Sequence, residues 1–190
     1  LARSTLLVNL RFLDAALSQF KSEPYDGTYA TDGRRLLYSA EHVLYSYRDE
    51  QQAPVRDYLH IVLHCVFRHM YVHNEVNRDC WDLACDIAVE QLIDGMYYRC
   101  IHIQPSMYRA DIRGRLAKRC AVMNAEHIYR ALQEMELSER EYERMVREYH
   151  VDDHSKWEDP DGPKSRTRGR QKKWDDNREK MQAEIETLGR

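Results

Sequence analysis

The sequence lacks the features that mark membrane-spanning, secreted and strongly charged proteins. Its uninterrupted apolar runs are only a few residues long, far shorter than a transmembrane helix requires. No signal-peptide pattern opens the chain, and the formal net charge of −3 over 190 residues gives no global signal for nucleic acid or membrane binding. We therefore expect a cytoplasmic globular protein that binds neither nucleic acid nor membrane.

Paired cysteines are lacking as well. The 5 cysteines form an odd set without a C-x-x-C pair, which indicates reduced and mostly buried side chains. The spacing of Cys80 and Cys85 fits no common zinc pattern. The chain begins at Leu1 rather than Met, so we expect it to be a segment of a longer protein.

Apolar residues recur mostly at steps of three and four, which predicts a largely helical chain. The first such stripe predicts one amphipathic helix over residues 2–20. Residues 104–119 have no clean period and are predicted to form a loop. Capping residues and apolar stripes predict further helices over residues 39–48, from Pro54 through the histidine-rich segment, from Asp79 or Asp82 to Gly95, and over 124–135 and 138–149.

The one clear strand signal surrounds Asp32-Gly33, a dipeptide suited to the positive φ angles of a tight turn. Residues 29–31 and 35–38 flank it and are predicted to form a small β-hairpin. The expected fold class is therefore α+β, mostly helical, with one hairpin. We expect a first domain over residues 1–158, a basic polar linker over 159–173 and a C-terminal helix over 174–190.

The helix that starts near Pro54 carries the clearest chemistry. His60 and His64 are four residues apart, so their rings project from one helix face and suit a single tetrahedral zinc ion. The rest of this helix is apolar, so both rings lie near buried surface, where they need polar partners. Asp86 lies on the next apolar segment, which we expect to pack antiparallel and to bring a carboxylate to the histidines.

The roles of the other polar residues near this pair stay open. Asp86 could hydrogen-bond a histidine without any metal. His69 points away from His64 on a straight helix, and with His73 it is expected to form a solvated pair at the helix end. His154 lies in the polar segment DDHSKW, which we expect to fold back over the histidines, with His154 as a lid residue or a contact of the ligands.

A general base is missing from the histidine motif. The residue after His60 is Ile61, where a zinc peptidase with the H-E-x-x-H motif carries its glutamate. Peptide hydrolysis on zinc needs a base that takes a proton from the attacking water. Glu90, one helical turn beyond Asp86, is the candidate for a substitute base.

Several short motifs between about Arg11 and Glu186 occur in the order found in one protein family. They are RFLDAAL, ATDGRRLLY, H-x-x-x-H-x-x-x-x-H at His60, His64 and His69, WDLACDIAVEQ, AEHIYRAL and DDHSKW. On these motifs the chain resembles a predicted metallopeptidase domain that precedes a von Willebrand A-like domain in bacterial proteins. The resemblance implies a zincin-like helical core, zinc as the cofactor, and His60, His64 and Asp86 as its ligands.

Two functions are compatible with this resemblance. The first is a zinc-dependent peptidase or hydrolase, in which Glu90 is the base and the hairpin offers an edge strand to a peptide or protein substrate. The second is a catalytically degenerate descendant, without catalytic residues, that keeps zinc as a structural clip. Ile61 favours the second. The resemblance also implies a von Willebrand A-like domain after residue 190 and a MoxR-type AAA ATPase as partners.

Overall fold

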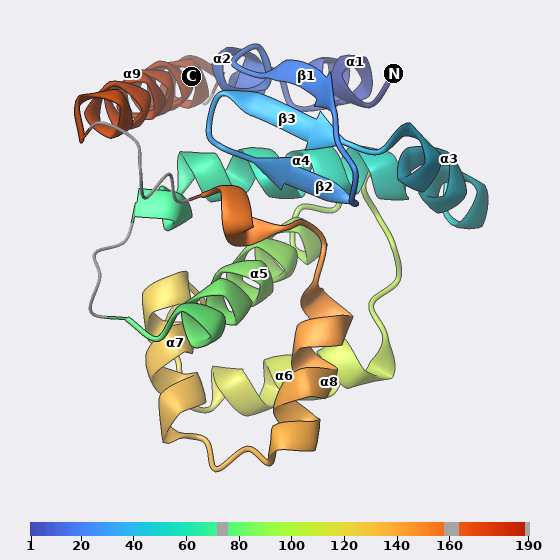
Figure 1. The fold of residues 1–190 in the computed structure, drawn as a ribbon, viewed down its shortest axis with the longest axis vertical. Helices are drawn as coiled ribbons and strands as arrows, with labels where there is room; N and C mark the ends of the chain where they lie inside the picture. The colour runs from blue at the N-terminus through green and yellow to red at the C-terminus, as the bar shows by residue number, and fades with distance from the viewer. Residues whose placement is uncertain (72–75, 158–163, 189–190) are drawn as a thin grey trace.

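The computed structural model describes residues 1–71, 76–157 and 164–188, so His73 lies outside the described residues. Within these ranges the chain is α+β and mostly helical, with one three-stranded sheet, which confirms the predicted fold class (Figure 1). None of the helices described is both long and apolar enough to cross a membrane.

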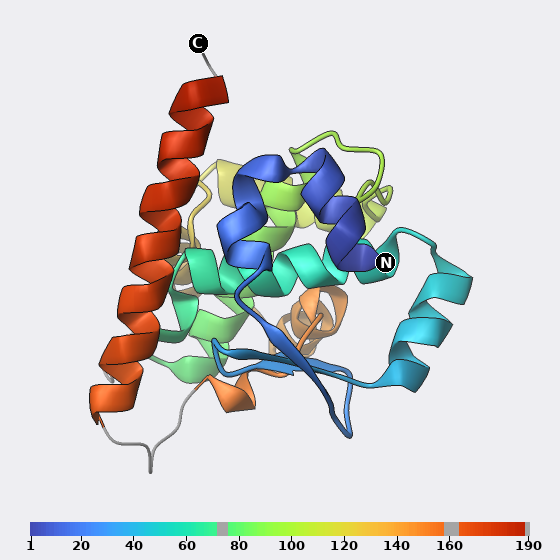
Figure 2. The ribbon, with the colours of Figure 1, turned by 90° about the horizontal axis from the view of Figure 1, so that it is seen from above.

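The N-terminal stripe is buried as predicted, but it does not lie on one continuous helix. α1 (Ala2–Asn9) ends where Leu10 leaves the helical conformation, with φ −128° and ψ 58°, and the 3-10 turn Arg11–Leu13 leads into the short α2 (Asp14–Leu17). The prediction of a single helix over residues 2–20 is therefore wrong. Apolar spacing reports which residues are buried, and the bend at Leu10 lets both short segments lie over α4 (Figure 2).

The predicted hairpin is confirmed. β2 (Tyr29–Thr31) pairs antiparallel with β3 (Arg35–Tyr38), and Gly33 has a φ of 79° in the turn between them. The turn is held by Asp32, whose Oδ1 accepts hydrogen bonds from the backbone N–H groups of the two residues after Gly33. A third strand, β1 (Lys21–Pro24), pairs parallel with β3 and gives the order β1-β3-β2. It was not predicted, because its residues are mostly exposed and show no apolar alternation.

α4 (Ala53–Val66) is the central element of the fold. It follows α3 (Ala40–Asp49), whose N-terminus is capped by Ser39 Oγ, as predicted. Pro54 lies in the first turn of α4. In Figure 1 the N-terminal helices lie above α4 and α5 lies below it, and in Figure 2 the sheet lies on the side of α4 away from the N-terminal helices. Nearly every side chain of α4 is buried, which explains its almost uniformly apolar sequence.

α5 (Arg78–Asp94) runs antiparallel to α4, as predicted. Residues near the start of α4 contact the end of α5, and those near its end contact the middle of α5, as in the pairs Arg56–Asp94 and His64–Asp86. The cap is Asn77, whose Oδ1 accepts from Cys80 N–H, rather than Asp79 or Asp82. The helix stops before Gly95, as predicted.

The predicted loop over residues 104–119 is wrong, since it contains α6 (Met107–Ala117). Ser106 Oγ caps this helix by accepting from Arg109 N–H. Within α6 only Ile112 and Leu116 are buried, so the apolar repeat is a single pair and gives no visible period. The capping serine directly after Pro105 was the available signal.

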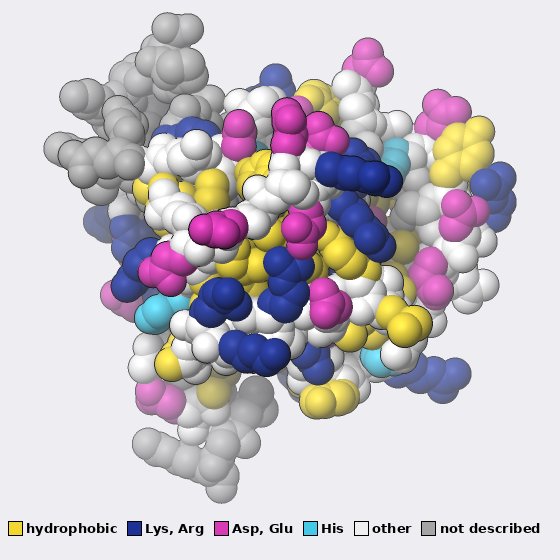
Figure 3. All heavy atoms as spheres, turned by 90° about the horizontal axis from the view of Figure 1, so that it is seen from below, with side chains coloured by type: hydrophobic (Ala, Val, Ile, Leu, Met, Phe, Trp, Pro, Cys, Tyr) yellow, Lys and Arg dark blue, Asp and Glu magenta, His cyan; other side chains and the backbone are white. Residues whose placement is uncertain are grey.

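α7 (Ala125–Glu134) and α8 (Glu139–Tyr149) begin after the predicted caps Asn124 and Ser138. Together with α6 they form the lower part of the molecule in Figure 1. Seen from that side, basic and acidic side chains are interspersed around a central apolar area, so this face carries no charge of a single sign (Figure 3). A 3-10 turn, His154–Lys156, follows α8.

α9 (Lys164–Leu188) begins earlier than predicted, so residues 164–173 are helical rather than part of a polar linker. The helix lies beside α2 and α4 (Figure 2). Trp174 is fully buried and donates a hydrogen bond from Nε1 to the Gly33 carbonyl oxygen at 2.9 Å. One anchoring tryptophan among charged residues explains why the sequence alone looked like a solvated segment.

Candidate metal centre

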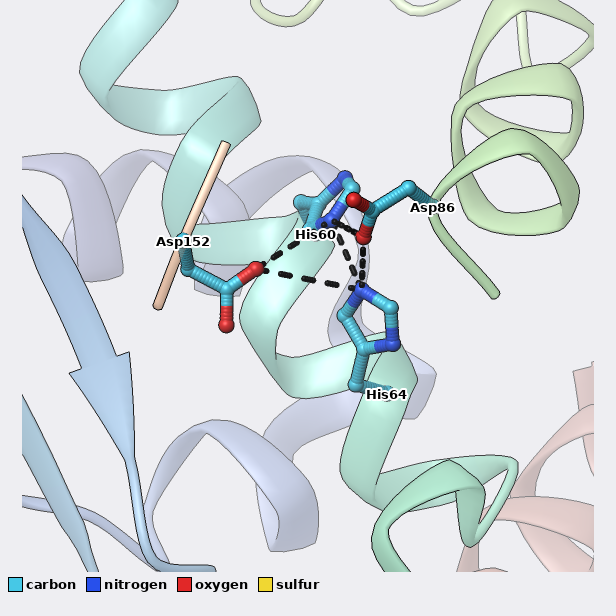
Figure 4. Close-up of side chains that lie close together, drawn as sticks. All are labelled: His60, His64, Asp86 and Asp152. Atoms are coloured by element: carbon cyan, nitrogen blue, oxygen red, sulfur yellow. Dashed lines mark hydrogen bonds and ion pairs between the residues drawn. The ribbon is translucent and has the colours of Figure 1, made fainter. Parts of the chain in front are cut away.

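Four buried side chains from three segments converge beside α4. His60 and His64 project from one face of α4, Asp86 from α5, and Asp152 from the segment after α8 (Figure 4). The two histidines are fully buried, and Asp86 and Asp152 are 6% and 1% exposed. One ligand atom from each lies within 4.8 Å of all the others.

The carboxylate–imidazole separations are close to those around a tetrahedral ion, while the two imidazole nitrogens lie closer together than two ligands of one ion. His60 Nε2 lies 2.7 Å from His64 Nε2 and 3.4 Å from Asp86 Oδ1, and His64 Nε2 lies 3.3 Å from the same oxygen. Asp152 Oδ1 is 3.5 and 3.9 Å from the two imidazole nitrogens. Tetrahedral ligands about 2.0–2.2 Å from an ion lie roughly 3.3–3.6 Å from one another, close to the carboxylate–imidazole distances observed.

The electrostatics of the group also favour a cation. Asp86 Oδ1 and Asp152 Oδ2 are buried and, within the described residues, lack a well-aligned hydrogen-bond donor. Burial alone would raise the pKa of Asp86, but the charge on His154 and the contacts with His60 and His64 hold it well below its usual range. Burial and the charge on His60 lower the pKa of His64 to about 4. Two carboxylates and a neutral imidazole are suitable ligands for a divalent ion.

Residues 150–157, which we call the strap, bring Asp152 to the group. Asp153 N–H donates to the Tyr29 carbonyl oxygen at 2.7 Å, and Tyr25 Oη donates to Asp153 Oδ2 at 2.7 Å. Trp157 is buried and stacks on His154 with ring centroids 3.6 Å apart. The prediction that DDHSKW folds back over the histidines is confirmed.

His154 contacts the carboxylates of the group but is not one of its four residues. Its Nε2 lies 3.2 Å from Asp86 Oδ1 and 3.3 Å from Asp152 Oδ1, and its Nδ1 lies 3.6 Å from Asp82 Oδ1. Burial opposes a charge on this ring, but the nearby carboxylates raise the pKa of His154 well above its usual range. His154 therefore supplies positive charge beside the two aspartates.

His69 lies beside the group instead of in an exposed pair. α4 ends at Val66 and Arg68 has a φ of 66°, which turns the chain back toward the histidine face. His69 is 5% exposed, and its Nδ1 lies 3.0 Å from His64 Nδ1. The prediction of an exposed His69 is wrong because the helix ends three residues before it.

Glu90 lies on the opposite side of His60 from the four-residue group. Its Oε1 lies 2.8 Å from His60 Nδ1, and its Oε2 accepts hydrogen bonds from Arg56 and Arg109. Burial would raise the pKa of Glu90, but His60 and the two arginines lower it far below its usual value. Both oxygens are thus engaged away from the group, which argues against Glu90 as a substitute base.

A cleft of about 660 Å³ opens onto the group from the side of α5, α8 and the strap. Asp86, Asp152 and His154 line it, together with Asp82 and Trp157. Ile61 is fully buried and is not among the lining residues, so position 61 faces the core rather than the cleft.

The edge of the sheet nearest the group is already paired. Ala30 of β2 forms a parallel bridge with Asp153 of the strap, on the side of β2 away from β3. The expectation that the hairpin offers this edge to a peptide is therefore wrong for β2.

A comparison with protein families supports the resemblance seen in the motifs. A family model described as "Putative metallopeptidase domain" matches residues 2–188, nearly the whole chain. The chain belongs to this family. No curated protein and no solved structure matches it. As a member of the metallopeptidase-domain family, the chain carries a buried His60–His64–Asp86–Asp152 group able to bind a metal.

Three of these four residues were candidates from the sequence, and the fold brings them together. Asp152 was not, although it belongs to the DDHSKW motif. The available signal was an Asp-Asp pair between a buried tyrosine, Tyr149, and a buried tryptophan, Trp157, since such anchors hold the polar residues between them against the core.

Proposed function

We propose that this metallopeptidase-family domain binds one zinc ion through His60, His64, Asp86 and Asp152. The observation that carries the proposal is the convergence of four buried ligand atoms from three separate segments, with carboxylate–imidazole separations of 3.3–3.9 Å. Two imidazoles and two carboxylates balance the charge of a divalent ion and match the ligand types that zinc accepts.

We further propose that the ion is a structural clip and that the domain is a degenerate peptidase. Zinc with an open coordination position supplies Lewis acidity and lowers the pKa of water, whereas structural zinc has four protein ligands. Asp152 lies where a fourth ligand belongs, and the fully buried Ile61 offers no base. The ion then joins α4, α5 and the strap.

Metal analysis of the purified protein tests the zinc site. The wild type, purified without a chelator, is expected to carry about one equivalent of zinc, and the His60→Ala/His64→Ala variant far less. Equal metal contents would refute the site. His127→Ala is the matched control, because His127 is half-buried on α7, away from the four-residue group, and among the described residues its hydrogen-bond partner is its own cap residue Asn124.

The cleft supports a second candidate, an active hydrolase. It leads from solvent to Asp86 and Asp152, so a substrate could reach the group if the strap moved Asp152 away. Robust, chelator-sensitive cleavage of casein by the wild type would favour this function over the structural clip. Asp152→Ala then separates a ligand role from a role in proton transfer, through its effects on zinc content and rate.

Partners of the domain are proposed from the family resemblance alone. A von Willebrand A-like domain and a MoxR-type AAA ATPase would make this chain the scaffold half of a larger assembly. Co-purification of the full-length protein with the ATPase from its native cells tests this, and its absence under crosslinking conditions would count against it.

A further inference from the structure

A buried ion-pair network lies behind His60, on the side away from the four-residue group. Glu90 is 1% exposed and Arg56 5%. Glu90 Oε2 accepts from Arg56 Nε at 3.1 Å, from Arg56 Nη2 at 2.6 Å and from Arg109 Nη1. Asp94 Oδ1 also pairs with Arg56 Nη2 at 2.6 Å. Glu148 Oε1 lies 3.3 Å from Arg109 Nε, so three carboxylates face two guanidinium groups, and of these three Glu90 is the one that contacts His60.

The two oxygens of Glu90 have different partners. Oε2 is occupied by three N–H donors from the two arginines, while Oε1 faces His60 Nδ1 at 2.8 Å. A carboxylate oxygen can only accept, so the hydrogen on this contact must be carried by His60 Nδ1. A histidine binds a metal as the neutral ring, and in a neutral ring with its proton on Nδ1 the lone pair available to the four-residue group is that of Nε2.

We propose that Glu90, oriented by Arg56 and Arg109, is a positioning residue that keeps the proton of His60 on Nδ1 and so makes Nε2 a metal ligand. This inference rests on the proposed metal site. A carboxylate behind a histidine ligand fixes the ring and increases its basicity, and loss of such a partner typically costs about 10–100-fold in metal affinity. His64 lacks a carboxylate here, because its Nδ1 faces His69.

The arginines make one substitution unusually informative. In Glu90→Gln the amide oxygen would be held where Oε2 now meets three N–H donors, since an NH₂ group there would oppose all three. The NH₂ group would then face His60 Nδ1 and donate to it. That contact requires an unprotonated Nδ1, so the ring proton would move to Nε2 and point into the metal group.

Nitrogen NMR of the imidazole rings, combined with zinc titration, tests the proposal. In ¹⁵N-histidine-labelled, metal-free wild type we expect His60 Nδ1 to be protonated, with its signal assigned through a His60→Gln variant. In Glu90→Gln we expect an unprotonated Nδ1 and a zinc affinity lower by about 10–100-fold. Asp94→Asn is the control: it removes the other carboxylate on Arg56 without touching His60, so proton position and affinity should stay as in the wild type.

Three results would overturn the proposal. They are an unprotonated His60 Nδ1 in the wild type, a Glu90→Gln variant that keeps both the Nδ1 proton and wild-type affinity, and an Asp94→Asn variant that loses as much affinity as Glu90→Gln. The last would mean that the network only stabilises the fold. If Glu90→Gln does not fold, the zinc-bound wild type decides: zinc on Nε2 with a proton on Nδ1 is expected, and zinc on Nδ1 would overturn the proposal. If the wild type binds no zinc, the proposed function fails, while the proton position in metal-free protein still tests the role of Glu90.

Discussion

Position 61 is where this chain departs from the H-E-x-x-H motif of zinc peptidases, because it carries isoleucine in place of glutamate. Ile61 is fully buried in α4, among apolar neighbours that include Leu59, Val62 and Leu63. A residue relieved of proton transfer can change to suit packing, and a branched aliphatic suits this surface. The side chain that stands in place of the catalytic base is therefore part of the apolar core.

We predict that Ile61→Glu destabilises the fold and gains only trace hydrolysis. Burying an unpaired carboxylate in this core should cost on the order of a few kcal/mol in the free energy of unfolding. Urea denaturation measures the loss, and a fluorogenic-peptide assay with and without chelator measures activity. Ile61→Val, which should cost only about 0.5–1.5 kcal/mol, is the control. Chelator-sensitive turnover by a stable Ile61→Glu protein would contradict the prediction.

Asp57 gives the metal-free protein a pH dependence of its own. It lines a second cleft of about 450 Å³, together with Glu90 and Arg109. Burial, helped by the charge on Glu90, raises the pKa of Asp57 from 3.8 to about 7. Folding thus favours the protonated carboxyl, and the stability from this group is complete below pH 3.8 and is lost as the pH rises toward about 7.

We therefore predict that Asp57→Asn stabilises the metal-free protein at pH 8 but not at pH 4. Because Asp57 is partly exposed to solvent, we expect a gain of only about 1–2 kcal/mol at the higher pH. Urea denaturation at both pH values, in the presence of chelator, measures the difference. An equal effect at pH 4 and pH 8 would contradict the assigned titration.

Site residues could be predicted from the sequence where helical spacing relates them, and could not where tertiary contacts alone bring them together. His60 and His64 lie four apart on one helix, and Asp86 stands out as a charge in an apolar segment. Asp152 shares no element with them and reaches the group through tertiary contacts of the strap, among them the hydrogen bond from Asp153 N–H to the Tyr29 carbonyl oxygen. Glu90 was noticed, but its orientation depends on Arg109 from α6, a helix that the sequence did not reveal.

Among the elements, the strap has the clearest functional consequence. It closes the edge of β2 through the Ala30–Asp153 bridge and carries Asp152 into the group. Its last residue, Trp157, is 5% exposed and packs against His154 and His64. Anchoring by one aromatic side chain holds a polar segment where its own residues would prefer water.

We predict that Trp157→Ala lowers zinc affinity by at least about tenfold, because the loosened strap no longer holds Asp152. Trp157→Phe keeps an aromatic ring on His154 and should retain most of the affinity. Competition titration with a chromogenic chelator measures both values, and circular dichroism checks that the helices remain. Unchanged affinity in Trp157→Ala would mean that Asp152 is held independently of the tryptophan.

Helices could be predicted from the sequence where an N-capping residue precedes a clear apolar stripe. Asn124 and Ser138 precede clear apolar stripes, and α7 and α8 begin where expected. α6 has a cap but buries only two side chains, and α9 has one buried tryptophan among charges, so both were missed in whole or in part. The bend at Leu10 leaves no trace in the spacing of the leucines on either side.

For the molecule as a whole, a bound ion that joins α4, α5 and the strap should contribute to the stability of the fold. A ligand present at about 100 times its dissociation constant stabilises by about 2.7 kcal/mol, and each kcal/mol shifts Tm by roughly 2–4 °C at this size. We predict that a chelator lowers the Tm of the wild type by about 5–10 °C. Calorimetry measures the shift. The His60→Ala/His64→Ala variant should not respond, and a similar response from that variant would assign the effect to another site.

The strap also determines at what stage of chain synthesis the four-residue group can assemble. Tyr25 and Asp153 meet although they are 128 residues apart in the chain, and Asp152 follows His64 by 88 residues (152 − 64). At about 5–20 residues per second, a ribosome takes roughly 4–18 s to make the stretch between them. His60 and His64 are therefore synthesised several seconds before Asp152. An ion that binds before Asp152 is synthesised can use only His60, His64 and Asp86. Four-ligand coordination therefore forms only after Asp152 has been synthesised.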